Sequence, residues 1–317
     1  MDVYWNIFES ISILIGIGII GFAIIARKIV PIKILEVVSP LILEIALPCL
    51  IFTNIVNRFS PESMELWWTL PLWSFAFAGI TLLFTFVAMS IIKPQNKPEF
   101  TISLLYPNFI FIPLLVIQNL FGENSNMLVE LFLFTLIFPA FLFNTYYLFF
   151  KKKQQATKKF DWAKIFNPIL IATALAVIIK LTGANDYIPN AFLKITKLIG
   201  NTALPLILIV IGGNVYVDFK RKGEIHTKQI LLFVALKNFI LPLLVLAVIL
   251  IIRPRVSVAF LFVLISAVPP ITAIPILTEK AGGNNSISNQ FLIASYITSI
   301  ISLPLIILLF THFYEIM

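Results

Sequence analysis

The chain carries too little charge to cover the surface of a soluble protein. Only 12% of its 317 residues are charged and 60% are hydrophobic, whereas soluble domains have about 25% charged residues. Its mean hydropathy is +1.00. This composition excludes the soluble enzyme classes and predicts an all-α, polytopic protein that lies in a lipid bilayer.

Cysteine and catalytic patterns are also scarce. The one cysteine, Cys49, lies within an apolar run, so the chain can form neither an intrachain disulfide nor a thiolate metal cluster. His226 and His312 have no metal-ligand neighbours in the sequence. It contains no Ser/His/Asp or Cys/His arrangement and no glycine-rich phosphate loop. We therefore expect a protein that is not an enzyme and holds no metal or cofactor.

The net charge of +8 does not indicate a nucleic-acid partner. The Lys and Arg residues occupy short loops between apolar runs and do not gather on one folded face. Residues 1–4 lack the basic segment of a signal peptide, and the apolar run at 5–26 is long enough to span a bilayer. We therefore expect no cleaved leader and a first transmembrane helix near the N-terminus.

Ten apolar runs approach the length of about 20 residues that a helix needs to cross a membrane. They are 5–26, 34–56, 67–92, 100–118, 128–150, 166–181, 191–217, 229–252, 256–278 and 288–313. The loops after the odd-numbered runs hold 16 of the 23 basic residues. Since basic loops stay in the cytoplasm, we expect a multi-pass protein of the cell membrane with both termini outside. Arg253 and Arg255, on the opposite face, argue against this orientation.

The two halves of the chain resemble each other. Residues 46–51 (ALPCLI) match 203–208 (ALPLIL) at an offset of 157, and residues 106–113 (YPNFIFIP) match 268–275 (VPPITAIP) at an offset of 162. We predict a five-helix repeat at 1–150, a basic cytoplasmic linker at 151–165 and a second repeat at 166–317. Because five is odd, the second repeat is inverted, as is typical of secondary transporters. The alternative is chance recurrence of short proline motifs.

The fourth and ninth runs carry clustered prolines near the expected centre of the bilayer. Proline removes a backbone donor and clashes with the preceding turn, and a broken helix is tolerated in a membrane only where it is buried or lines a cavity. We predict that the breaks cross and aim helix N-termini, which attract anions, at a substrate site. Ordinary proline kinks are the alternative. The predicted binding residues here are Pro107, Asn108, Pro113, Pro269, Pro270, Thr272 and Pro275.

Two ionisable residues lie deep in apolar runs, where a charge is costly and marks a candidate functional site. We predict that Lys237, with its neighbour Asn238, faces a substrate carboxylate or supports the crossing when the site is empty. Glu44 is a candidate proton carrier, and Asn201 is its counterpart in the second repeat. The alternatives are a Glu44–Lys237 ion pair, or side chains that reach a polar seam between helices.

Together these motifs make the chain similar to the auxin efflux carrier family, within the superfamily that includes the bile acid:sodium symporters, as a short, prokaryotic-type member. The resemblance covers the whole chain. It rests on the order of Leu47-Pro48 with Phe52, Asn167-Pro168 with Ala172, Ala203-Leu204-Pro205-Leu206 with Gly212, and the two broken runs. It implies a scaffold of runs one, two, six and seven, a transport unit of the other six runs, an X-shaped crossing, elevator-like movement and frequent homodimers through the scaffold.

The sequence departs from this family pattern in three places. Phe109 follows Asn108 where members often have Asn-Thr-Gly or a similar motif. No carboxylate lies beside residues 268–270, where bile acid symporters place a sodium ligand. The long cytoplasmic loop of the plant hormone carriers is missing. The missing carboxylate weakens the expectation of a sodium-coupled protein, and the missing loop makes auxin only a family label.

We therefore expect a secondary transporter that moves a small organic anion, either an auxin-like carboxylate or a dicarboxylate, by elevator-type alternating access. Protons or the substrate gradient would drive it. The alternatives are a sodium-coupled organic anion symporter of the bile acid type and a transporter-like membrane sensor. A sensor would need an output domain and a channel a filter-like repeat, and we find neither in the sequence.

Overall fold

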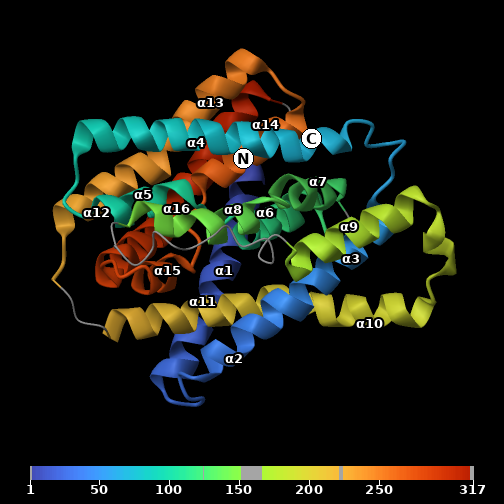
Figure 1. The fold of residues 1–317 in the computed structure, drawn as a ribbon, viewed down its shortest axis with the longest axis horizontal. Helices are drawn as coiled ribbons and strands as arrows, with labels where there is room; N and C mark the ends of the chain where they lie inside the picture. Colours follow the sequence, from blue (N-terminus) through green and yellow to red (C-terminus); the bar gives the residue numbers. More distant parts are fainter. Residues whose placement is uncertain (1, 124, 151–165, 221–223, 315–317) are drawn as a thin grey trace.

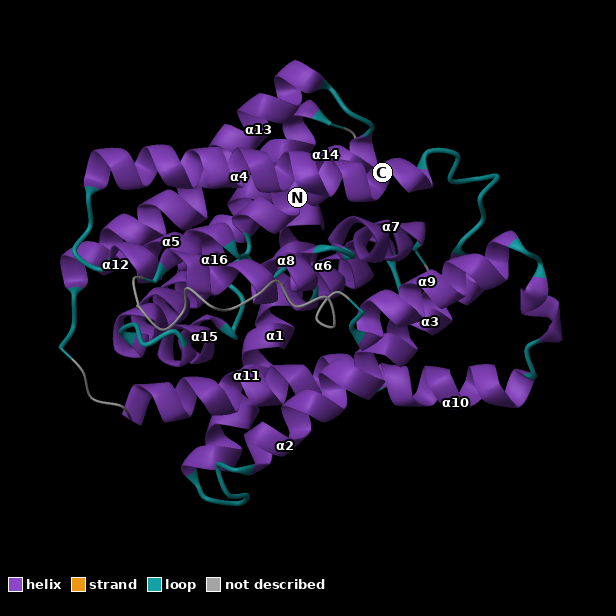
Figure 2. Ribbon diagram, in the orientation of Figure 1, coloured by secondary structure: helices purple, strands orange, loops and turns teal. Residues whose placement is uncertain are grey.

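The computed structural model describes residues 2–123, 125–150, 166–220 and 224–314 (Figure 1). Within these ranges every named element is a helix (Figure 2), which confirms the prediction of an all-helical protein. The predicted linker at 151–165 lies outside the described residues. The α-helices are α1 (Asp2–Ala26), α2 (Ile34–Leu41), α3 (Leu47–Arg58), α4 (Leu70–Ile92), α5 (Lys97–Leu105), α6 (Phe111–Phe121), α7 (Asn126–Thr135), α8 (Phe138–Thr145), α9 (Pro168–Leu181), α10 (Asn190–Asn201), α11 (Ala203–Lys220), α12 (Thr227–Val234), α13 (Leu241–Ile252), α14 (Val256–Ala267), α15 (Ile274–Lys280) and α16 (Asn285–Phe313).

Six helical segments in the described residues are long and apolar enough to cross a membrane. They are Ile34–Arg58, Trp67–Ile92, Asn126–Phe149, Asn190–Val217, Thr227–Ile252 and Asn285–Phe313. The other four predicted runs contain shorter apolar helices, at Ser12–Ala26, Phe111–Phe121, Pro168–Leu181 and Val256–Ala267. Length and composition therefore support six membrane-crossing segments, and the ten-span inverted repeat stays a prediction.

Proline accounts for where the predicted runs are interrupted. Run four divides into α5 and α6, and run nine divides into α14 and α15. Run five also divides, just before Pro139 in the first turn of α8, and run seven divides at Thr202, just before Pro205 in the first turn of α11. Proline is tolerated in the first turn of a helix because its missing N–H has no intrahelical partner there. We did not predict these two further breaks.

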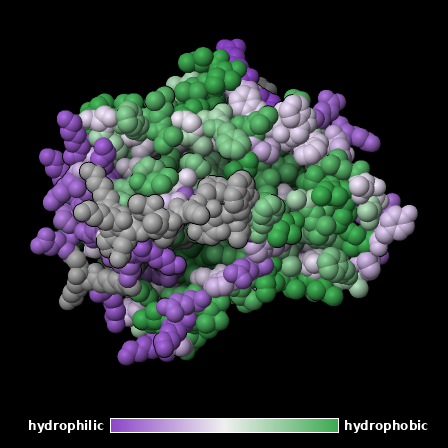
Figure 3. Space-filling view, in the orientation of Figure 1, coloured by the Kyte–Doolittle hydropathy of each residue, from purple (hydrophilic) through white to green (hydrophobic). Residues whose placement is uncertain are grey.

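Apolar side chains cover much of the molecular surface. Ile91 is 76% exposed and Ile251 is 83% exposed, and a soluble monomer rarely exposes such side chains over a large continuous area. Figure 3 shows apolar side chains above, below and to the right of the grey atoms on this face, and hydrophilic ones mainly at the end where α11 ends and α12 begins in Figure 1. This distribution fits a chain whose middle is surrounded by lipid.

Helix contacts divide the molecule into two groups. In the scaffold group (α1–α3 and α9–α11), α1 and α2 pack on α11, and α3 packs on α9 and α10. In the crossing group (α4–α8 and α12–α16), α16 packs on α5, α12, α14 and α15, and α4 packs on α5 and α7. The groups meet where α1 contacts α6 and α16, and where α3 contacts α7. The family resemblance implies the same grouping of helices.

The scaffold group contains a close approach of two helix backbones. A Cβ atom on Gly212 of α11 would overlap the carbonyl oxygen of Gly18 in α1. A Cβ atom on Gly21 would overlap the carbonyl oxygen of Ile209. Small residues permit this packing between membrane helices, so α1 and α11 form a tightly joined pair.

Candidate functional site

The two proline breaks contact each other through their backbones. Pro107 and Pro270 form an isolated antiparallel bridge. The Asn108 amide donates to the Pro269 carbonyl at 2.8 Å, and the Ile271 amide donates to the Tyr106 carbonyl at 3.0 Å. Proline leaves carbonyl groups without helical partners, and here each break supplies an amide to a carbonyl of the other. The bridge thereby compensates part of the cost of breaking two helices inside the molecule.

The bridge has a local two-fold symmetry. The offset between its paired residues is one residue larger than the offset between the matching sequence motifs. Pro107 and Pro270 are 163 positions apart, and the same offset maps one bridge hydrogen bond onto the other. The outer prolines of the two motifs match at an offset of 162. In space, Asn108 therefore corresponds to Ile271, and Thr272 corresponds to Phe109.

The side chain of Asn108 holds three parts of the crossing group together. Its Oδ1 atom accepts a hydrogen bond at 3.1 Å from the amide of Phe111, the first residue of α6. Its Nδ2 atom donates to the Tyr296 hydroxyl of α16 at 3.1 Å. Because Asn108 is buried, both bonds are protected from bulk water. Asn108 thus has a structural role in addition to any contact with a ligand.

Glu44, which is exposed, and Lys237, which is buried, both lie on widened helical turns that precede a proline. Glu44 belongs to a π-helical turn, Ile42–Ala46, and Lys237 to another, Ala235–Ile240. Pro48 and Pro242 follow, in the first turns of α3 and α13. Since proline cannot donate to the carbonyl four residues earlier, the helix cannot continue with regular bonding, and single π-turns occur frequently at functional sites.

Lys237 is completely buried, and its Nζ atom donates to the Ser266 carbonyl at 2.8 Å. Ser266 lies in the last turn of α14, beside the crossing. Carbonyl groups in a last turn lack intrahelical partners and carry partial negative charge. Both Glu44 and Lys237 are described, and the structure contains no ion pair between them. Lys237 therefore binds the end of a broken helix.

Asn238 participates in a buried polar network with α16. Its Nδ2 atom donates to the Ser295 carbonyl at 3.2 Å and to the Ser302 hydroxyl at 3.3 Å. The Ser295 hydroxyl in turn donates to the Asn238 Oδ1 atom at 2.8 Å. These bonds join the π-turn at Ala235–Ile240 to α16 inside the crossing group.

A cavity of about 370 Å³ separates the crossing from the scaffold group. On the crossing side it is lined by Asn108 and Thr272, and on the scaffold side by Glu44, Asn167 and Asn214. Most of the remaining lining is apolar, contributed by Leu43, Leu47, Phe109, Ile110, Phe111, Pro139, Leu142, Phe143, Pro168, Ile169, Ile207, Val210, Ile271, Ala273 and Ile276. We call this space the Glu44 cavity.

The structure brings together only part of the predicted site. Asn108, Thr272 and Glu44 line the Glu44 cavity. The five predicted prolines are buried at or beside the crossing, and none of them is among the lining residues. Lys237 and Asn238 lie within the crossing group, apart from the lining. Their direct contact with substrate stays a prediction.

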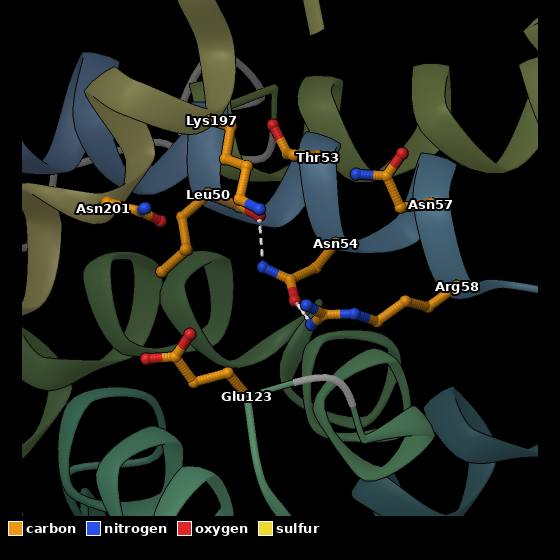
Figure 4. A pocket seen from close by; sticks show the side chains of 8 residues that line it. All are labelled: Leu50, Thr53, Asn54, Asn57, Arg58, Glu123, Lys197 and Asn201. Carbon is orange, nitrogen blue, oxygen red and sulfur yellow. Dashed lines mark hydrogen bonds between the residues drawn. The ribbon is translucent and has the colours of Figure 1, made fainter. Parts of the chain in front are cut away.

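Asn201 lies apart from Glu44, in a second cavity. Figure 4 shows this cavity, which also contains Lys197 of α10 and Arg58 of α3. Asn201 is the last residue of α10, and it is not among the residues that line the Glu44 cavity. The described residues contain no group of three or more His, Cys, Asp or Glu side chains that could hold a metal ion.

Sequence reasoning did not select two scaffold residues of the Glu44 cavity. Asn167 caps α9, where its Oδ1 atom accepts from the Leu170 amide at 2.9 Å, and Asn before Pro is a sequence signal for such a helix start. Asn214 lies in the middle of α11. A polar residue in an apolar helix was a usable signal, but sequence alone could not place it on the cavity side.

The Membrane transport protein family model matches residues 6–307, which is nearly the whole chain. A comparison with curated proteins found no match. The extent of the family match, the buried crossing of two broken helices and the apolar surface agree with one another. The chain belongs to the membrane transport protein family, which includes the auxin efflux carriers, as its sequence resemblance predicted.

Proposed function

We propose that this protein is a secondary transporter that moves a small organic anion through the Glu44 cavity. The observation that carries the proposal is that one cavity joins the crossing residues Asn108 and Thr272 to the scaffold residue Glu44. A ligand in this space would touch both helix groups. Movement of the crossing group along the scaffold group, with the ligand between them, would give alternating access of the elevator type.

The lining of the Glu44 cavity favours a ligand with an apolar body. Its walls are mainly Leu, Ile, Val and Phe side chains with few polar residues, and such pockets orient a ligand through a small number of polar groups. A compact dicarboxylate would place a second charge against apolar walls, which is costly. We therefore favour an aromatic or aliphatic monocarboxylate over a dicarboxylate.

Glu44 is a candidate for coupling the transport of an anion to protons. Among the described residues that line the cavity, Glu44 is the one with a formal charge. An ionised carboxylate repels an anionic ligand in a region of low dielectric constant. We propose that Glu44 carries a proton while the anion is bound, so that a proton and an anion would move together.

Lys237 offers an explanation for transport without sodium. Its Nζ atom holds the Ser266 carbonyl beside the crossing, which is where a bound cation would otherwise stabilise the ends of broken helices. We propose that the Lys237 amine takes the place of a bound cation at this position. The sodium-coupled alternative requires an ion site elsewhere. The proposed homodimer through the scaffold helices would keep the scaffold group fixed during movement.

A weak organic base is the second candidate substrate. The observation that favours it is the same Glu44 carboxylate, which would form an ion pair with a cation in the cavity. The two candidates differ in the direction of proton movement. An anion moves with a proton on Glu44, whereas a cation replaces that proton.

Uptake by purified protein in liposomes separates these candidates. The probes are radiolabelled indole-3-acetate, succinate and benzylamine, each tested with an inward proton gradient, an outward proton gradient, an inward sodium gradient or no gradient. We expect indole-3-acetate uptake to increase at least tenfold with the proton gradient and to be unaffected by sodium. Uptake of benzylamine but not of indole-3-acetate, driven by the outward proton gradient, would support the second candidate. Sodium-driven uptake would contradict the proposed role of Lys237.

A further inference from the structure

The second cavity, of about 340 Å³, differs chemically from the Glu44 cavity. It lies between α3, α10 and the turn that follows α6 (Figure 4). Its lining residues are Leu50, Thr53, Asn54, Asn57, Arg58, Glu123, Lys197 and Asn201. All of them except Leu50 are polar, and two are cations. We call this space the Arg58 cavity.

Hydrogen bonds within the scaffold group position the two cations. The guanidinium of Arg58 donates to the Asn54 side chain, which is buried and in turn donates to the Leu50 carbonyl at 2.8 Å. The Thr53 hydroxyl donates to the Thr196 hydroxyl at 3.1 Å and joins α3 to α10. This contact places Lys197, the next residue of α10, at the same cavity as Arg58. The two positive groups therefore face one space from a tightly packed pair of helices.

The one acidic lining residue comes from the other helix group. Glu123 follows Gly122 at the end of α6, and Figure 4 shows it on the opposite side of the cavity from Lys197 and Thr53. Its carboxylate interacts electrostatically with Arg58. With two cations and one carboxylate, the lining has a net charge of one positive unit. An added carboxylate would compete with Glu123 for the two cations.

The two cavities follow one another along the same helical segment. Ser39, Leu43 and Leu47 line the Glu44 cavity, and Leu50, Asn54 and Arg58 line the Arg58 cavity. These positions recur every three or four residues, which places them on one helix face. Leu47 and Leu50 are separated by about 4.5 Å along the axis at the helical rise. The cavities therefore lie next to each other along the boundary between the two helix groups.

We propose that the Arg58 cavity is an anion-binding site that takes the carboxylate of an organic acid and precedes the Glu44 cavity on the transport path. Arg58 binds the carboxylate through paired N–H donors, and Lys197 contributes a second charge. Its two cationic side chains would select anions, and the Glu44 cavity has no cationic side chain among its described lining residues. The order of the two sites rests on the proposed function, whereas binding to the Arg58 cavity does not.

Succinate is the probe, because the apolar Glu44 cavity disfavours a dicarboxylate whereas the Arg58 cavity offers two cations. The melting temperature of the purified full-length protein is measured as succinate replaces chloride at constant ionic strength. We expect a rise in the wild type, at least tenfold weaker binding in Arg58→Gln and Lys197→Gln, and tighter binding in Glu123→Gln. Lys194→Gln is the matched control, because Lys194 is exposed on α10 and does not line the cavity.

Several results would overturn the inference. They are the absence of any rise in the wild type, unchanged binding in Lys197→Gln, an equal loss in Lys194→Gln, and loss of binding in Thr272→Val. Lys197 is exposed, so its substitution tests the site even if Arg58→Gln fails to fold. Succinate binding that follows the expected pattern in a protein without transport activity would support this site and contradict the proposed function alone.

Discussion

The amine of Lys237 donates a hydrogen bond to the carbonyl of Ser266 at 2.8 Å, and both residues are completely buried. This contact joins a widened turn before α13 to the last turn of α14. An ammonium group in the centre of a bilayer costs roughly 2.5–3.5 kcal/mol on the lenient insertion scale. Its bond to the negative end of a broken helix offsets part of that cost.

Substitution of Lys237 should therefore affect transport more than stability. We expect Lys237→Met to lower indole-3-acetate uptake at least tenfold with little change in melting temperature, because replacing a buried charge by an apolar group of similar volume is often neutral. Lys228→Gln is the control, since Lys228 is exposed near the start of α12. Wild-type transport by Lys237→Met would remove Lys237 from the mechanism.

Asn108 and Tyr296 allow the structural and binding roles of the crossing to be separated. Asn108→Ala removes the bond from the Phe111 amide at the start of α6 and the bond to the Tyr296 hydroxyl, while Tyr296→Phe removes only the second of these bonds. Each lost hydrogen bond should cost about 1 kcal/mol, so both variants should melt at lower temperature and Asn108→Ala at the lowest.

Binding should differ between these two variants, because Asn108 lines the Glu44 cavity and Tyr296 does not. We expect Asn108→Ala to weaken indole-3-acetate binding at least tenfold and Tyr296→Phe to change it less than threefold, measured by equilibrium binding in detergent. Equal weakening in both variants would mean that Asn108 acts by positioning α16 and not by touching the ligand.

Gly212 tests the tight packing of the scaffold group. Gly212→Ala places a methyl group against the Gly18 carbonyl, and such overpacking typically costs 1–3 kcal/mol. We expect a clear fall in melting temperature. Gly16→Ala, on the same helix as Gly18, is the control, because a Cβ atom there meets nothing within 4 Å. Equal stability of the two variants would contradict the close α1–α11 contact.

The sequence indicated the chemistry of the crossing better than its geometry. The proline clusters around Pro107 and Pro270 predicted broken helices, because a missing donor is a local property. The bridge between them, with its offset of 163, depends on how two distant segments pack. Lys237 was recognisable as a deep charge, but its partner Ser266 was not, since the contact arises from packing of α14 against the turn at Ala235–Ile240.

On the scaffold side of the site, the sequence likewise indicated the chemistry of a residue but not its position in space. Glu44 was recognisable as a carboxylate in an apolar run, and the structure places it at a cavity with Asn108 and Thr272. Its assumed counterpart, Asn201, lines the Arg58 cavity. Sequence repeats align positions along the chain, but they do not say which cavity a side chain will line, because that depends on how distant helices pack.

Coupled uptake by Glu44→Gln most directly tests whether the Glu44 cavity moves an anion together with a proton. In liposomes, we expect this variant to lose uptake of indole-3-acetate driven by a proton gradient, while it still exchanges internal for external indole-3-acetate without a gradient. Glu36→Gln is the control, since Glu36 lies on α2 and does not line the cavity. It should behave like the wild type. Undiminished proton-driven uptake by Glu44→Gln would contradict the account.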